Sequence, residues 1–500
     1  MPTLKWEAKD DIDDNTYDFK EIKPLQTIEL IKPRIVENSP NEQFEIAEKK
    51  RNLLILGDNK IVMRCLLEDF SNKIDLIYID PPFATGGNFP FKIIIGENGE
   101  YEVVTSYFDT WKGGIDGYLD FLYPRFLLMK ELLSETGSIY IHLDWHVVHY
   151  IKLMLDEIFG IANFRNEIIW MYPAASARTR NFFIRSYDAI LFYTKSDDYI
   201  FNDDPNIYME YSNRVKNALK EDEKGKFYYR GGSHNGKKLS RKVYVKQDGI
   251  FPRDIWNDIP YVRANTVEYQ AFATQKPERL LKRIILASTK ENQLVADFFC
   301  GSGTTLAAAE KLGRRWIGCD STSHAINICR KRILNIEKSY DLNSWNNEYN
   351  ITPKAFEIKK TSVNKNNYEL GNSSLIKDPL NSFQKGSPNF KFKVKQEKNS
   401  IAIILTDYLI PFLEDINEDL RNKIDTFLDW IDYWSIDFNY NNRIFKPDWW
   451  SFRSQKNKSL QSESMPYLMK EINSKGISIA IKVIDILGIE SLQIYEMNHN

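Results

Sequence analysis

The chain has 500 residues, 43% of them hydrophobic, and a formal net charge of -2. This length corresponds to roughly two to four domains, and the hydrophobic content suffices for a sizeable core. Because positive and negative charges nearly cancel, the net charge indicates no class of partner, and only local clusters of charge are informative. None of the four cysteines pairs at C-x-x-C spacing, which argues against a zinc site or a disulfide framework.

Cellular location is predicted from what the sequence lacks. The N-terminal stretch is charged and has no apolar signal segment. No apolar run approaches the roughly 20 residues that span a bilayer. Free thiols fit a reducing compartment. We therefore expect a cytoplasmic protein with no membrane segment.

Short apolar runs of strand length follow one another along the first two thirds of the chain. They are almost continuously apolar, which is typical of strands buried on both faces. Helical patterns lie between them, at residues 118–135, 278–288 and 304–313. Strands that alternate with helices predict an α/β fold with a largely parallel sheet. The predicted strands cover residues 52–57, 73–80, 137–144, 166–172, 187–194, 293–299 and 314–320.

Changes in composition predict the domain boundaries. A charged N-terminal arm covers residues 1–50, and a catalytic α/β domain covers 51–340, with a polar, tyrosine-rich insert at 195–274. Asn, Ser and Lys are frequent in the next stretch, so residues 341–395 are predicted to be a linker. Residues 396–500 are predicted to form a separate α+β or β-rich module.

A glycine turn follows one of the predicted buried strands in DFFCGSGTT, residues 297–305. Glycines let the chain turn tightly and let a ligand approach the main chain, and ligands of open α/β sheets bind beyond the carboxyl ends of strands. The next strand ends in Asp320, an acid that can accept bonds from ribose hydroxyls. Together they indicate a nucleoside-containing cofactor. Taken alone, an ordinary strand-to-helix turn capped by Asp320 explains the pattern equally well.

A second unusual strand end is DLIYIDPPF, residues 75–83. The prolines fix their own φ angles and hold the preceding residue extended. The Asp80 carboxylate and the Pro81 carbonyl are therefore two rigid acceptors that match the two N–H groups of a nucleobase amine, and Phe83 can stack on the flat ring. A proline-terminated strand followed by a buried Phe is the competing interpretation.

The two motifs together resemble the DNA amino-methyltransferases that use S-adenosylmethionine. Asp80-Pro81-Pro82-Phe83 matches their target-amine motif, and Phe299-Cys300-Gly301-Ser302-Gly303 matches their cofactor motif. The amine motif comes first, an order typical of the β class, and the sequence is similar to the modification subunits of type III restriction systems. The resemblance spans residues 50–340. It implies a Rossmann-like methyltransferase sheet with circularly permuted motif order and a target-recognition region in the insert.

The resemblance also implies roles for further residues. Asp58 follows an earlier strand where the family places an acid near the cofactor adenine, and Lys276 lies where the family binds the cofactor's methionine carboxylate. Asp297 is expected to face the cofactor's amino group. As simpler alternatives, Asp58 is a turn residue and Lys276 a solvated lysine. The implied cofactor-binding set is Asp58, Lys276, Asp297, Phe299, Gly301, Gly303, Thr304 and Asp320, with no metal.

Two basic segments are predicted to contact DNA. Residues 224–246 carry eight Lys or Arg and no acid, with aromatic residues between them, which suits phosphate contacts. Residues 177–185 form a shorter basic run. A solvated basic loop is the competing interpretation of the longer segment. The predicted DNA-binding residues are Arg178, Arg180, Arg185, Arg230, Lys237, Lys238, Arg241 and Lys242.

The predicted reaction is methylation of the adenine N6 amine in double-stranded DNA, within a restriction-modification or related defence system. Transfer to the N4 amine of cytosine is an alternative, because that amine also carries two hydrogens. A catalytically idle DNA-binding subunit is the alternative from another class. A restriction endonuclease or helicase subunit and a second copy of the chain are the expected protein partners.

Overall fold

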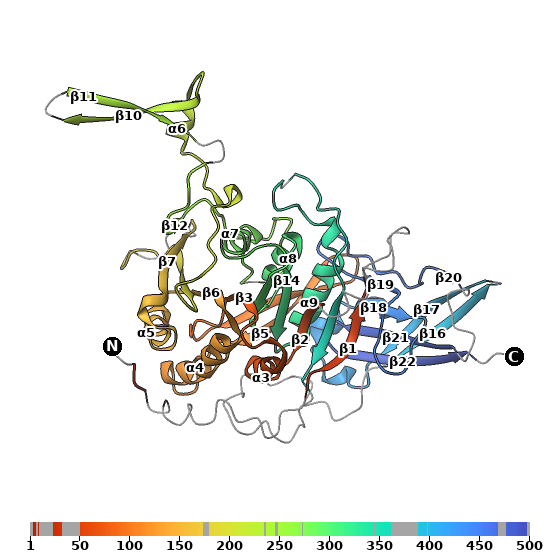
Figure 1. Ribbon diagram of the computed structural model, residues 1–500. Coiled ribbons are helices and arrows are strands. Elements are labelled where there is room, and N and C mark those ends of the chain that lie inside the picture. Colours follow the sequence, from red (N-terminus) through yellow and green to blue (C-terminus); the bar gives the residue numbers. More distant parts are fainter. Residues whose placement is uncertain are drawn as a thin grey trace.

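In the computed structural model of the chain (Figure 1), most of the catalytic region and of the C-terminal module is described. No helix within the described residues has both the length and the apolar character needed to cross a membrane. The described residues are 4–6, 9, 24–32, 51–173, 180–234, 237–245, 249–272, 274–344, 346–361, 389–397, 399–468 and 477–497.

A ten-stranded mixed sheet forms the centre of the catalytic region. All seven predicted strands lie in it. The pairings from β15 through β6 are parallel, whereas β8 is antiparallel to both of its neighbours. In spatial order the strands are β1 (Gln26–Ile31), β15 (Phe356–Lys360), β2 (Asn52–Leu56), β14 (Arg315–Asp320), β13 (Leu294–Asp297), β3 (Ile74–Ile79), β6 (Leu133–Leu143), β8 (Tyr187–Thr194), β7 (Phe164–Met171) and β12 (Ile255–Trp256).

Helices cover both faces of this sheet and make a three-layer α/β fold. One face packs against α3 (Asn59–Phe70), α4 (Ile115–Leu132) and α5 (Val148–Phe159), in a core that includes Ile77 and Phe126. The other face packs against α7 (Glu278–Ser288), α8 (Thr304–Lys311) and α9 (Ser323–Leu334), in a core that includes Val295. Both faces are apolar, which explains the nearly continuous apolar strands of the sequence. The predicted α/β class is confirmed.

The sheet extends past both ends of the predicted catalytic domain. β1 comes from the predicted N-terminal arm and pairs with β15, which comes from the predicted linker and pairs with β2. Glu29 on β1 is fully buried and accepts hydrogen bonds from Arg330 on α9 and Lys482 in the C-terminal module. The N-terminal strand, the catalytic region and the C-terminal module therefore share a buried charged cluster.

The C-terminal module consists of two antiparallel sheets around one core, as its β-rich prediction requires. A separate hairpin, β4 (Asn88–Ile95) with β5 (Glu100–Phe108), contributes Phe91 and Ile93 to that core. The first sheet contains β16 (Asn389–Glu397), β17 (Ser400–Leu409) and β20 (Tyr467–Leu468). The second contains β19 (Trp449–Phe452), β18 (Ile431–Asp437), β21 (Ile477–Asp485) and β22 (Glu490–Met497).

The insert between β8 and α7 carries a long β-hairpin of β10 (Gly225–His234) and β11 (Lys237–Tyr244). A short strand, β9 (Lys220–Asp222), pairs with its base. Figure 1 shows the hairpin projecting well away from the central sheet, on the far side of the molecule from the C-terminal module. The insert is therefore divided: its hairpin forms a projecting arm, whereas β12 joins the central sheet and Trp256 packs in the core.

Candidate active site

The two sequence motifs meet at one edge of the central sheet. β13 and β3 are parallel neighbours, with Val295 opposite Leu76 and Ala296 opposite Ile77. Asp80 lies as far beyond Ile77 as Phe299 lies beyond Ala296, so the proline motif and the glycine turn leave the sheet side by side. Ligands of open α/β sheets bind at such carboxyl ends. The spatial arrangement that a shared site requires is present.

Asp80 has one carboxylate oxygen engaged and one without a partner. Its Oδ2 accepts a hydrogen bond from Lys276 Nζ at 2.6 Å. Its Oδ1 is buried and has no partner among the described residues, and leaving a buried polar atom unpaired costs about 1–3 kcal/mol. The Pro81 carbonyl accepts no hydrogen bond from any described residue. Both predicted acceptors for an amine thus keep an oxygen that no described donor occupies.

The loop that carries Phe83 is fixed by a buried carboxylate. Asp109, which is fully buried, accepts hydrogen bonds from the main-chain N–H groups of Phe83, Ala84 and Thr85. Tyr118 Oη donates to the Pro82 carbonyl at 2.7 Å. The chain around Phe83 is therefore held in place before any ligand arrives.

The Phe83 ring lies on a polar network beneath it. The ring is nearly parallel to the imidazole of His142, at 15° and 6.3 Å between centroids. His142 is buried between Tyr78 Oη and Asp188 Oδ2, each at 3.0 Å. Burial alone raises the pKa of Asp188, but the hydrogen bond and charge of His142 outweigh it and leave this pKa below its usual value. These hydrogen bonds fix the orientation of the His142 ring, on which the Phe83 ring stacks.

The glycine turn is braced by Asp320 and Arg332. Gly301 N donates to Asp320 Oδ2 at 3.0 Å, while Thr322 N and Oγ1 donate to Asp320 Oδ1. Arg332 Nη1 donates to the Ser302 carbonyl at 2.9 Å. Asp320 thus shapes the turn directly, and the ribose contact predicted for it stays a prediction.

Asp297 lies beneath the turn in a position that favours its neutral form. Its carboxylate accepts from Phe299 N at 3.0 Å and from Thr305 Oγ1 at 2.5 Å. Burial, reinforced by the charges of Asp80 and Asp320, raises the pKa of Asp297 to about 7. A cation placed beside this carboxyl would stabilise its ionised form.

Asp58 is the N-cap of α3, which agrees with the simpler interpretation as a turn residue. Its Oδ1 accepts from the N–H groups of Lys60 and Ile61, and its Oδ2 pairs with Arg125 on α4 at 2.8 Å. Asn59 Nδ2 donates to the Phe298 carbonyl at 2.8 Å. Asp58 therefore lies close to the strand that leads into the glycine turn, and its contact with an adenine stays a prediction.

The predicted DNA-binding residues fall into two groups, and Arg178 lies outside the described residues. Arg180 and Arg185 are exposed, and the Arg185 guanidinium stacks 3.7 Å from the centroid of Trp145, just beyond β6. This segment leads into β8, which supplies Asp188 to the network under Phe83. Arg180 and Arg185 therefore lie just before the strand that carries Asp188, a residue of the candidate site.

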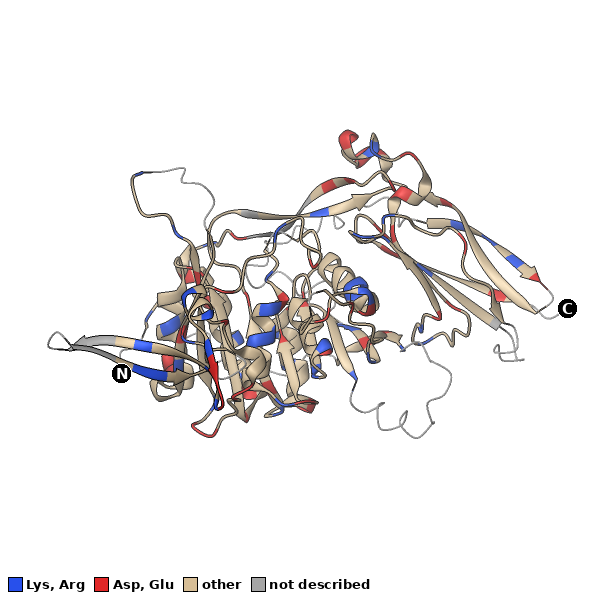
Figure 2. Ribbon diagram, turned by 90° about the horizontal axis from the view of Figure 1, so that it is seen from above, with Lys and Arg blue, Asp and Glu red and all other residues tan. Residues whose placement is uncertain are grey.

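The second group lies on the projecting hairpin. Arg230 and Arg241 are exposed cross-strand partners, and Figure 2 shows basic segments along both strands of the hairpin. Lys237 and Lys238 belong to β11. Lys242 is paired with Asp222 at 2.8 Å, so its charge is partly neutralised within the protein. The structure places this group on the arm and not at the edge of the sheet.

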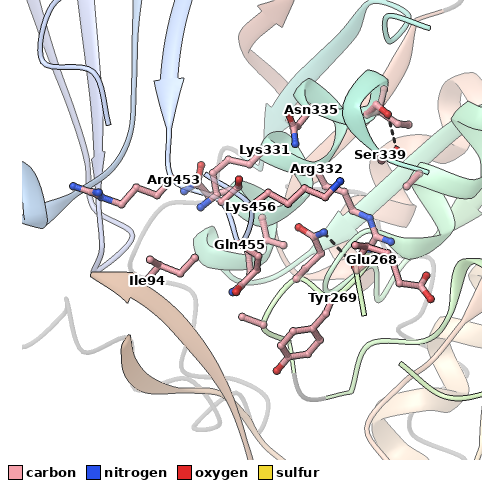
Figure 3. Close-up of a pocket in the computed structure, with 18 of the residues that line it drawn as sticks. Ile94, Glu268, Tyr269, Lys331, Arg332, Asn335, Ser339, Arg453, Gln455 and Lys456 are labelled. Carbon is pink, nitrogen blue, oxygen red and sulfur yellow. Dashed lines mark hydrogen bonds between the residues drawn. The ribbon is translucent and has the colours of Figure 1, made fainter. Parts of the chain in front are cut away.

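A separate pocket lies between the catalytic region and the C-terminal module (Figure 3). Side chains from α9 and from the module's segment 453–456 line it, with Glu268 and Tyr269 opposite. None of the predicted active-site residues belongs to its lining. Arg332 connects the two places, because it lines the pocket and also holds the Ser302 carbonyl.

Several residues of the site escaped the sequence analysis. Asp109, His142 and Asp188 belong to no motif in the sequence. Their role in supporting the Phe83 loop is visible only in the folded structure. Asp188 had one available signal, since it lies at the start of a strand near that edge. Arg125 gave none, because it is one of several charged residues in the α4 sequence.

Comparisons with known proteins agree with this geometry. The model of a family described as DNA methylase matches residues 74–331, which include both motifs and Lys276. The chain is 30% identical over 324 residues to the type II methyltransferase M.EcaI of Enterobacter cloacae, covering 56% of this chain and 69% of that protein. It is 31% identical over 264 residues to the DNA adenine methyltransferase YhdJ of Escherichia coli K12, covering 53% and 77%.

Similarity extends to the modification subunits expected from the sequence and to solved structures. The StyLTI Mod subunit of Salmonella typhimurium, a type III restriction-modification enzyme, is 26% identical over 355 residues, covering 57% of this chain and 53% of that protein. The crystal structure of the M1.HpyAVI–SAM complex is 18% identical, covers 56% of this chain and 98% of that one, and has a TM-score of 0.34. The family expected from the two motifs is confirmed: the chain belongs to the DNA methylase family.

Proposed function

We propose that the protein transfers a methyl group from S-adenosylmethionine to the N6 amine of an adenine in duplex DNA. The observation that carries the proposal is the buried, unpartnered Oδ1 of Asp80 beside the glycine turn. A carboxylate oxygen in that state needs a donor, and a nucleobase amine provides one. Family membership and the adenine methyltransferase YhdJ among its relatives support adenine as the target.

The residues at the glycine turn fit the proposed cofactor. Gly301 and Gly303 have positive φ, which lets the main chain turn tightly at the strand end where the cofactor would bind. The Asp297 carboxyl is suited to an ammonium group, and Asp320 and Asp58 provide further acceptors near the same strand ends. When bound, the cofactor supplies the electrophilic methyl group, so the protein has to contribute orientation and a reactive amine.

Asp80 and Pro81 would activate the amine. The lone pair of an aromatic amine is delocalised into the ring, which makes the nitrogen a poor nucleophile. Hydrogen bonds from its two N–H groups to Asp80 and the Pro81 carbonyl favour a more tetrahedral nitrogen. A bond to a charged acceptor contributes about 1.5–3 kcal/mol, and it accelerates the reaction only as far as it strengthens in the transition state.

The Phe83 ring would offset part of the cost of bringing the base to the site. A base inside a duplex has to be flipped out, at a cost of a few kcal/mol. Stacking a base on an aromatic ring returns about 1–3 kcal/mol. Because Asp109 and His142 fix the Phe83 loop and ring, little further ordering is needed when the base arrives.

The deciding experiment identifies the modified base. Duplex DNA is incubated with the full chain and S-adenosylmethionine carrying a labelled methyl group, then digested to nucleosides. We expect the label in N6-methyladenine. Label in N4-methylcytosine would show that cytosine is the target. DNA binding without any transfer would show that the protein is a catalytically idle DNA-binding subunit.

Cofactor affinity should depend on pH through Asp297. Because its pKa is about 7, the carboxyl is mostly protonated at lower pH, whereas a bound ammonium group favours the ionised form. Binding should therefore release a proton, and affinity should rise by up to tenfold per pH unit and level off above roughly pH 7. Calorimetric titrations with S-adenosylhomocysteine over a pH series test this. Asp297→Asn should bind weakly with a nearly flat profile, and an unchanged slope in that variant would remove Asp297 from the ammonium site.

The hairpin should contribute to DNA affinity through phosphate contacts. Replacing both Arg230 and Arg241 by Ala removes two exposed charges without touching the central sheet. We expect weaker binding of all duplexes and a slope of log affinity against log salt that is smaller by about two. Fluorescence anisotropy at several salt concentrations measures both. Lys290→Ala, an exposed charge after α7, is the control; an equal loss in that variant would mean that the hairpin has no special role.

The wider biological setting is also a proposal. Several relatives carry the name of type III Mod subunits, which supports a restriction-modification setting and a restriction partner. A homodimer and action in the cytoplasm belong to the same proposal. Purification of the tagged chain from its native cells, with identification of any restriction subunit that accompanies it, would test the partner directly.

A further inference from the structure

The ion pair between Lys276 and Asp80 lies in the middle of the candidate site. Lys276 Nζ is 2.6 Å from Asp80 Oδ2, and the two side chains are 11% and 17% exposed. The same ammonium is 5.4 Å from the centroid of the Phe83 ring. It therefore contacts the predicted amine acceptor and also lies over the predicted stacking surface.

A flipped base needs both of those positions. Its amine has to donate to Asp80, and its ring has to lie against Phe83, at contact distances of about 3 and 3.5 Å. The Lys276 ammonium takes one Asp80 oxygen and the space over the ring, which leaves only the buried Oδ1 without a donor. A base amine can still donate to Oδ1, but its ring cannot lie flat on Phe83 while the ammonium occupies that face, so Lys276 has to move before the base is fully seated.

Only the side chain of Lys276 is able to move aside. Its main-chain carbonyl accepts a hydrogen bond from Thr304 Oγ1 at 3.1 Å, at the start of α8. The next residue, Pro277, is the N-cap of α7. The backbone is thus tied to the glycine turn and to a helix, while the four-carbon stem of a lysine is flexible. A second anion near the glycine turn would give the ammonium another partner.

We propose that Lys276 is a placeholder for the target amine: in the unliganded protein it occupies Asp80, and the carboxylate of the bound cofactor draws it away and opens the base site. The inference rests on the proposed function, since it needs that cofactor and that base. It makes Lys276 a positioning residue that couples the two ligands. Coupling of this kind is reciprocal and typically amounts to roughly 5- to 150-fold in affinity.

The test measures DNA binding with and without S-adenosylhomocysteine, which retains the carboxylate but lacks the methyl group. The duplexes contain the target adenine opposite a mismatched base, or purine, which lacks the amine, at the same position. In the wild-type protein we expect S-adenosylhomocysteine to tighten binding of the adenine duplex at least about fivefold, and of the purine duplex less. Absence of such coupling in the wild-type protein would overturn the proposal without any variant.

Two substitutions sharpen the test. Lys276→Met should bind the adenine duplex more tightly than the wild type when no cofactor is present, bind S-adenosylhomocysteine more weakly, and lose most of the coupling. Lys276→Arg, which keeps the charge, should retain it, and Lys290→Met controls for general loss of charge. Full coupling in Lys276→Met would contradict the proposal. A wild-type protein that binds neither ligand would instead refute the proposed function.

Discussion

Replacing Asp80 by Ala should remove nearly all methyl transfer while cofactor binding survives. The substitution removes a hydrogen bond between the amine and a charged acceptor, worth about 1.5–3 kcal/mol, and the part of it gained in the transition state lowers the rate by up to roughly 150-fold. It also leaves the Lys276 ammonium without its partner beside the base site. We therefore expect a loss of at least about 100-fold in single-turnover rate with labelled cofactor.

The controls separate a chemical defect from a folding defect. Asp69→Ala removes an exposed acid from α3 and should leave the rate unchanged. Thermal denaturation and titration with S-adenosylhomocysteine should show that Asp80→Ala is folded and binds the cofactor. A variant that keeps a tenth or more of the wild-type rate would remove Asp80 from the role of amine acceptor.

Replacing Gly303 by Ala should disrupt the cofactor site. Gly303 has φ +74°, and a Cβ there would lie 2.8 Å from Cys329 Sγ. The left-handed conformation costs a non-glycine residue about 1–2 kcal/mol, and the buried sulfur adds a steric conflict. The turn has to shift to relieve it, so we expect at least about tenfold weaker binding of S-adenosylhomocysteine by calorimetry.

Gly313 provides a closely matched control at the other end of the same helix. Its φ is also +74°, but a Cβ there would meet only Glu291 Cγ at 4.0 Å. Gly313→Ala carries the same conformational cost without the close contact, so it should lose some stability and keep its cofactor affinity. Equal losses of affinity in both variants would show that the conflict at Cys329 does not matter.

The sequence was sufficient to predict the central sheet and the meeting of its two motifs. Each predicted strand is a short apolar run, and burial on both faces is what such runs require. Parallel order then brings the ends of β3 and β13 to one edge, although Asp80 and Gly301 are far apart in the chain. The edge strand β1 and its neighbour β15 were not predicted, because their polar, partly exposed patterns resemble those of an arm and a linker.

The contacts that organise the site were beyond sequence analysis for a different reason. Lys276 and Asp80 are 196 residues apart, and a lysine before a proline carries no sign of its partner. The support of Phe83 by His142 depends on the position of β6 beside β3. Pairings of this kind depend on tertiary structure, so only a complete fold reveals them.

The projecting hairpin has a consequence for how members of such a family diverge. Its described strands pair with each other and with β9, and they share no pairing with the ten-stranded sheet. Side chains on the arm can therefore be exchanged without repacking the layers that hold Asp80 and the glycine turn. Under the proposed function, a change of preferred DNA sequence would need few compensating substitutions elsewhere, and new specificities would arise while the chemistry is conserved.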